Sequence, residues 1–71
     1  MNLVEARMKK RKTQWDLRIA TGIHQSKLSL IENGYVVPSI DETMRIAQAL
    51  GVSVDDIEWT QIIRKSRSKR G

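Results

Sequence analysis

The stretch TQWDLRIATGIHQSKLSLIENG, residues 13–34, contains two short helical patterns separated by a glycine. Thr13 can cap a helix over residues 14–21, because its hydroxyl can accept a hydrogen bond from a free amide of the first turn. Two apolar residues are expected to face the core from this helix, Leu17 and Ala20. Gly22 ends the helix, since glycine adopts positive φ without a steric penalty.

A second helix is predicted over residues 25–33, after a short turn. Leu28 and Ile31 have the spacing of an inward helical face, and Asn33-Gly34 closes the helix. Two short helices joined by a tight turn that contains glycine form a helix-turn-helix. Such corners also occur in many helical bundles, so the corner alone is weak evidence of function.

Helical spacing continues on both sides of this stretch, and no segment alternates as a strand does. A helix is predicted over residues 2–12, with three residues on its inward side, Leu3, Val4 and Met8. Pro38 places a loop after the second helix of the corner. Ser39 and Glu42 have capping-box spacing and open a helix that ends at Gly51. This helix carries the apolar residues Ile40, Ile46, Ala47 and Leu50.

Ser53 opens a predicted fifth helix that continues to about residue 65, with Val54 and Ile57 facing the core. Residues 66–71 contain only Ser, Arg, Lys and Gly, a composition that cannot bury apolar surface, so a disordered basic tail is expected. We therefore predict one all-α, five-helix domain over residues 1–65.

Composition limits the classes of function. The 71 residues carry a net charge of +5, but five of the 13 basic residues lie in the last eight positions, which leaves a neutral body. Basic residues crowd the first part of that body and acidic ones the second, as expected for a protein that turns one end toward a polyanion. No cysteine is present, which excludes disulfides and thiolate metal sites.

Neither an enzyme nor a membrane protein is expected. One histidine, no cysteine and no acidic pair flanking a pocket leave nothing from which to build a nucleophile, a metal site or an acid-base couple, so we predict no catalytic residues, no metal and no cofactor. No apolar run reaches the roughly 20 residues that span a bilayer, and the N-terminal stretch lacks the apolar core of a signal peptide. A cytoplasmic location is the expectation.

The spacing of residues 13–34, together with the later Pro38-Ser39 and Ala49-Leu50-Gly51-Val52-Ser53, resembles the lambda-repressor-like family, also called the XRE or Cro/C1-type family. The resemblance covers about residues 3–57. It implies a five-helix domain that binds double-stranded DNA and regulates transcription, most simply as a repressor, with a recognition helix over about 25–33. An antitoxin that binds a toxin as well as operator DNA is the alternative that it leaves open.

Site residues follow from the resemblance position by position. Base edges would be read by Gln25, Ser26, Lys27, Ser29 and Leu30, since glutamine suits adenine, lysine suits guanine or phosphate, and leucine can touch a thymine methyl. The DNA backbone would be contacted by Thr13, Gln14, Arg18, His24, Asn33, Gly34 and Tyr35. Arg7 and Glu32 match a structural ion pair of the family. Three positions depart from the family pattern: Arg18 stands where alanine is usual, and Lys12 and Thr43 where leucine is common.

A homodimer is expected from apolar residues late in the chain. Val54 and Ile57 already supply the inward side of the predicted fifth helix, so a self-complementary patch could be formed by Trp59, Ile62 and Ile63. The competing interpretation is that these residues pack on their own core. A dimer would favour a two-fold symmetric operator.

Overall fold

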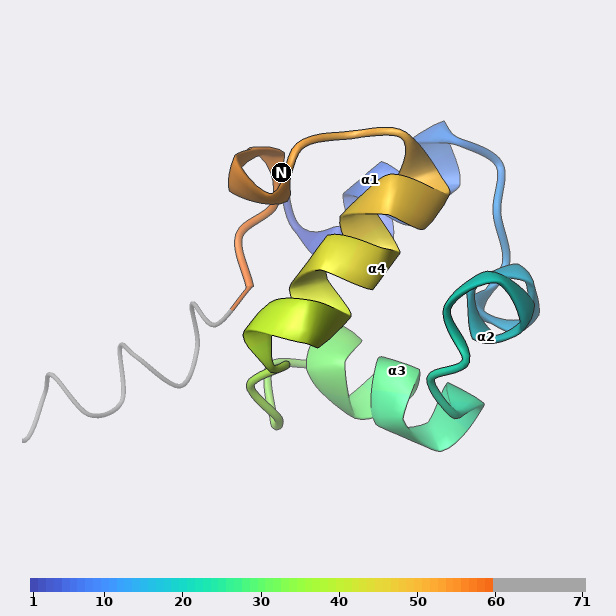
Figure 1. The fold of residues 1–71 in the computed structure, drawn as a ribbon, viewed down its shortest axis with the longest axis vertical. Coiled ribbons are helices and arrows are strands. Elements are labelled where there is room, and N and C mark those ends of the chain that lie inside the picture. The colour runs from blue at the N-terminus through green and yellow to red at the C-terminus, as the bar shows by residue number, and fades with distance from the viewer. Residues whose placement is uncertain (60–71) are drawn as a thin grey trace, which may run out of the picture.

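The computed structural model describes residues 1–59. Four α-helices and a 3-10 turn follow one another in the order α1 (Leu3–Lys9), α2 (Gln14–Thr21), α3 (Gln25–Glu32), α4 (Ile40–Leu50) and η1 (Val54–Asp56). In Figure 1, α4 crosses the middle of the domain, with α1 behind its upper half, α2 at its side and α3 below. Within the described residues the fold is therefore all-α, as predicted.

Capping residues set most of the helix ends. Asn2, Thr13 and Ser39 each accept a hydrogen bond from the third residue of their helix, whose acidic side chain bonds back to the cap. Gly22 and Gly51 take left-handed conformations at the ends of α2 and α4, with φ of 77° and 70°. The predicted bounds of α2 are confirmed, and α3 ends at Glu32, one residue earlier than predicted.

The core contains apolar side chains from α1 to α4, from the turn between α2 and α3, and from the residue that follows η1. They are Leu3, Ala6, Leu17, Ile23, Leu28, Ile31, Ile46, Leu50 and Ile57. Two predicted inward residues are wrong, because Ala20 is exposed and Met8 is 65% exposed. Ile40, an apolar residue of α4, is 79% exposed. Val4 is half-buried rather than part of the core.

The corrections have local reasons. On α1 the pair at i, i+3 that faces the core is Leu3 and Ala6, which turns Met8 outward. On α2 the residue that shares the inner face with Leu17 is Thr21, one turn later. Thr21 can be buried because its hydroxyl donates to the Leu17 carbonyl at 2.6 Å and accepts from the Ile23 amide at 3.1 Å.

Two predicted helices are shorter in the structure. α1 ends at Lys9 rather than at residue 12, because Arg11 adopts a positive φ of 57° and turns the chain. The predicted fifth helix is wrong over residues 57–59, since η1 lasts only three residues and Ile57 is extended. Glu58 instead forms a parallel bridge with Asn2, and its amide donates to the Met1 carbonyl at 2.8 Å. The continuation to residue 65, Ile62, Ile63 and the tail 66–71 lie outside the described residues.

Candidate nucleic-acid interface

The corner between α2 and α3 is held rigidly from inside. Gly22 supplies the left-handed turn, and the buried Thr21 hydroxyl ties the last turn of α2 to Ile23, which is 5% exposed. Arg45 on α4 adds a hydrogen bond from its guanidinium to the Thr21 carbonyl at 3.3 Å. The sequence Thr-Gly-Ile therefore fixes the direction in which α3 leaves α2. Sequence reasoning identified the glycine but missed Thr21 and Arg45.

α3 has a buried side and an outward side. Leu28 and Ile31 are 0% and 3% exposed and anchor the helix to the core. Because successive helical residues turn by about 100°, the opposite side is formed by the remaining polar positions and one leucine. These outward residues are Gln25, Ser26, Ser29, Leu30 and Asn33, of which all but the half-buried Ser29 are exposed. The structure thus brings four of the five predicted base-reading residues to one surface, hereafter the outer face of α3.

The fifth of them, Lys27, lies elsewhere. Its ammonium nitrogen is 2.8 Å from a carboxylate oxygen of Glu42, in the first turn of α4. Lys27 is therefore directed along the flank of α3 toward α4 and clamps these two helices together. Part of this contact was predictable from the sequence, because the capping box at Ser39 places Glu42 in the first turn of its helix. The capping box does not reveal which residue of another helix Glu42 contacts.

The Lys27 clamp has a consequence for stability in acid. The hydrogen bond from Lys27, followed by that from the Ser39 amide, holds the pKa of Glu42 below its ordinary value of 4.5. A carboxyl whose pKa is lowered by folding stabilises the native state above its ordinary pKa and loses that contribution as the pH falls through the folded-state value. We expect the thermal midpoint of unfolding to decrease as the pH is lowered below about 4.5. In Glu42→Gln this decrease should be smaller.

Thermal unfolding followed by circular dichroism across this pH range is the measurement. Lys27→Met, which removes the main cause of the lowered pKa, should flatten the profile in the same direction as Glu42→Gln. An acid profile that Glu42→Gln leaves as steep as that of the wild type would contradict the role assigned to this contact.

His24 and Ser26 form the entry to α3. The Nδ1 atom of His24 accepts from the Ser26 amide at 3.2 Å and lies 3.0 Å from the Ser26 hydroxyl oxygen. His24 is thus the N-cap of α3 rather than a free surface side chain. Gln25, the first helical residue, is exposed beside this cap and begins the outer face of α3.

A network of charged and amide groups joins α1, α2 and α3. Glu32 accepts from Arg7 Nε at 2.6 Å, from Arg7 Nη2 at 3.3 Å and from Gln14 Nε2 at 2.8 Å. Arg7 also donates from Nη1 to the Lys12 carbonyl at 3.1 Å. The Glu32 side chain is 5% exposed and that of Arg7 is 16% exposed, so this is a nearly buried ion pair. Gln14, expected at a DNA phosphate, is also part of this network.

Arg18 stays at the surface of α2. Its guanidinium carbon lies 4.6 Å from the centroid of the Trp15 ring, a cation–π distance, and Trp15 is 53% exposed. The substitution of an arginine for the usual small residue therefore does not require a buried, unpaired charge. Thr43, another departure, is buried because its hydroxyl donates to the Ile40 carbonyl at 2.7 Å. Lys12 is exposed.

The segment after α3 uses its own amides locally. The Gly34 amide donates to the Ile31 carbonyl at 3.1 Å, and the Tyr35 amide donates to the Leu30 carbonyl at 2.9 Å. The Asn33 side-chain amide donates to the Ser29 carbonyl at 2.8 Å. Of this expected phosphate clamp, the Tyr35 side chain is the most open part, at 72% exposed.

Positive charge gathers at the start of α2. Four consecutive basic residues are exposed there, Lys9, Lys10, Arg11 and Lys12. Beside them, the Thr13 amide and hydroxyl lower the pKa of Asp16, and the charge of Lys12 adds to this effect. The connection from α1 to α2 is thus basic, whereas acidic residues outnumber basic ones over residues 32–59.

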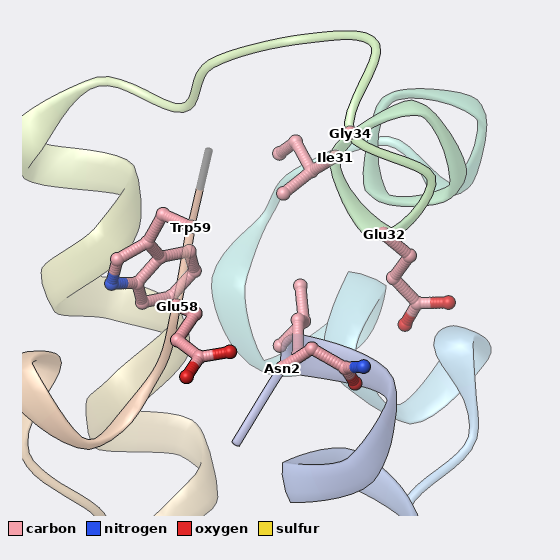
Figure 2. Close-up of a pocket in the computed structure, with 7 residues that line it drawn as sticks. Asn2, Ile31, Glu32, Gly34, Glu58 and Trp59 are labelled. Carbon is pink, nitrogen blue, oxygen red and sulfur yellow. The ribbon is translucent and has the colours of Figure 1, made fainter. Parts of the chain in front are cut away.

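A cavity of about 200 Å³ lies away from the outer face of α3, between the start of α1, the end of α3 and the chain after η1. Figure 2 shows Trp59 across from Ile31 and Gly34. Trp59 is half-buried against the core cluster, and its indole N–H donates to the Val54 carbonyl at 3.1 Å. Trp59 therefore packs largely on its own domain.

Residues 1–59 lack the features of two other kinds of site. No cluster of histidine, cysteine or acidic side chains there is arranged to hold a metal ion. None of the helices in that range combines the length and apolar character needed to cross a membrane.

Comparison with known proteins gave one match. A family model described as a helix-turn-helix domain matches residues 3–59, which includes α1 to α4 and η1. Searches of curated proteins and of solved structures gave no match. The family match agrees with the resemblance inferred from the spacing of residues 13–34.

Proposed function

The chain belongs to the helix-turn-helix domain family, and from that premise we propose that it binds double-stranded DNA sequence-specifically, with α3 in the major groove, and represses transcription. The observation that carries the proposal is the outer face of α3, whose polar side chains are exposed while Leu28 and Ile31 fix the helix to the core. The major groove is about 12 Å wide and admits one α-helix.

Base reading is assigned mainly to Gln25, Ser29 and Leu30. Gln25 is exposed at the start of α3, where recognition helices of this kind reach base edges, and its amide can pair with adenine N6 and N7. Leu30, 43% exposed, can touch a thymine methyl. Ser26 contributes less to discrimination, because its hydroxyl is engaged with His24. Lys27 contributes through its clamp on α4 and not through a base.

Backbone contacts are assigned to the ends of the two helices. Thr13 and Gln14 begin α2, where the helix dipole favours an anion, and Tyr35 follows α3 with an open side chain. Arg18 and His24 lie on the same two-helix unit. Such contacts position the protein on the duplex, and base contacts then provide the specificity.

Selection of bound sequences from random duplex DNA tests the proposal. We expect a defined motif in two half-sites about 10 bp apart, or a multiple of this, because we also propose that two copies bind a two-fold symmetric operator. A chain lacking residues 66–71 should bind more weakly but select the same motif. Recovery of no preferred sequence would contradict the proposed function, and a single half-site would contradict the dimer.

Gln25→Ala is expected to lower discrimination at one base pair of each half-site by about 1–3 kcal/mol, or roughly fivefold to 150-fold. The reason is the loss of both amide hydrogen bonds to one base. Titration of the selected duplex and of its single-base variants measures the effect. Gln48→Ala, which changes another exposed glutamine, on α4, is the matched control and should leave base preference unchanged. An unchanged preference in Gln25→Ala would mean that α3 is not placed as proposed.

A further inference from the structure

Arg11 has an unusual backbone conformation. Among residues 1–59 it is the one residue other than glycine with a positive φ, at 57°. Its amide donates to the Met8 carbonyl at 2.9 Å, and the Lys12 amide donates to the Arg7 carbonyl at 3.0 Å. These two bonds form a helix-ending motif whose left-handed position is usually occupied by glycine, because a Cβ atom is disfavoured there.

No contact within the described structure explains an arginine at this position. The Arg11 side chain is exposed, and it takes part in none of the ion pairs or side-chain hydrogen bonds found within residues 1–59. The two backbone hydrogen bonds hold the turn but do not require an arginine, and non-glycine residues in left-handed conformations cluster at functional positions.

The turn that carries Arg11 is fixed to the helix-turn-helix unit. Arg7 donates to the Lys12 carbonyl and is itself bound to Glu32 at the end of α3. Two residues after Arg11, Thr13 caps α2. Figure 1 shows this connection running along the edge of the domain into the start of α2. Arg11 therefore has a defined position relative to the helix end that we assigned to a DNA phosphate.

Charge and chemistry favour an anion at Arg11. Lys9, Lys10 and Lys12 are exposed around it, so the local field is positive. A guanidinium presents its N–H groups in a planar fork that matches two phosphate oxygens, which an ammonium cannot do.

We propose that Arg11 binds a DNA backbone phosphate beside the start of α2, and that its left-handed backbone directs the side chain there. The inference rests on the proposed function, since it needs DNA on this side of α2. It adds a contact that the resemblance to the family did not supply.

Arg11→Gly distinguishes backbone strain from DNA binding. Relief of strain should raise stability, whereas loss of the phosphate contact should lower affinity. Its thermal midpoint should equal or exceed that of the wild type, since glycine tolerates the left-handed turn. Its affinity for a mixed-sequence DNA duplex should nevertheless fall about tenfold at low salt, through loss of one charged, bidentate contact. The slope of log affinity against log salt concentration should decrease in magnitude by about 0.9, the value for one phosphate contact.

Two further variants act as controls. Arg11→Lys keeps the charge and should keep the wild-type salt slope. Gln48→Glu lowers the net charge by the same one unit at an exposed position of α4 and should also keep that slope.

The possible failures are distinguishable. A wild-type chain that binds no duplex would overturn the proposed function and this inference together. Binding by the wild type with an unchanged slope in Arg11→Gly would overturn this inference alone. A lower thermal midpoint for Arg11→Gly would overturn it too, since the strain would then be absent.

Discussion

Glu32→Ala is expected to lower the free energy of unfolding by about 3–5 kcal/mol. The carboxylate accepts two hydrogen bonds from Arg7 and one from Gln14, and its removal leaves a nearly buried guanidinium without its partner. At about 0.05–0.15 kcal/mol per residue, a domain of this size has a total stability of the same order. Urea denaturation followed by circular dichroism should therefore show a much earlier midpoint or a chain already unfolded.

Glu58→Ala is the matched control for this substitution. The Glu58 side chain is 61% exposed and lies 3.9 Å from the N-terminal ammonium, so its removal should change stability by less than about 0.5 kcal/mol. The double variant Arg7→Met, Glu32→Leu should recover part of the loss, because it removes the buried charge as well as its partner. A Glu32→Ala protein as stable as Glu58→Ala would show that the network contributes nothing.

The same network relates stability to DNA binding. Glu32 is the last residue of α3, whereas Arg7 and Gln14 belong to α1 and α2. One carboxylate thus sets the relative positions of three helices, including the helix that we place in the groove. Glu32 does not lie on the outer face of α3. Its substitution should therefore change the affinity for DNA only through the relative positions of the three helices.

The bounds of a helix were predictable from the sequence where a capping residue marks each of its two ends. α2 begins after Thr13 and ends before Gly22, and both residues act through contacts within a few positions of the chain. The end of α1 carries no glycine, so the left-handed turn at Arg11 could not be inferred from residue preference. Ser53 marks the start of η1 but not its length. That length depends on the pairing of Glu58 with Asn2, which local sequence patterns do not encode.

The candidate interface was also only partly predictable from the sequence. Helical spacing separates the inner face of α3 from the outer one, and the resemblance identified Gln25 as its first residue. Lys27 was placed with the base readers because its position on α3 alone does not reveal Glu42, which reaches it from another helix. The amides of Gly34 and Tyr35 were assigned to phosphate, whereas the helix that they terminate already uses them.

Leu28→Ala is expected to destabilise the domain by about 2–5 kcal/mol, and Leu30→Ala by less than about 0.5 kcal/mol. The two substitutions delete the same atoms from one helix, two residues apart. Leu28 is 0% exposed, so its loss leaves a cavity under α3, while Leu30 is 43% exposed and leaves none. Urea denaturation of both variants measures the difference.

In DNA binding the order of the two effects should be reversed: Leu30→Ala should change the base preference, and Leu28→Ala should not. Leu28→Ala should lose affinity only in proportion to the unfolded fraction and keep the wild-type base preference, because it contacts no base. Leu30→Ala should stay folded and weaken the preference for thymine at one position, as removal of a contact to the C5-methyl group requires. A Leu30→Ala variant that is the less stable of the two would mean that the faces of α3 are reversed. The outer face would then not be the surface presented to DNA.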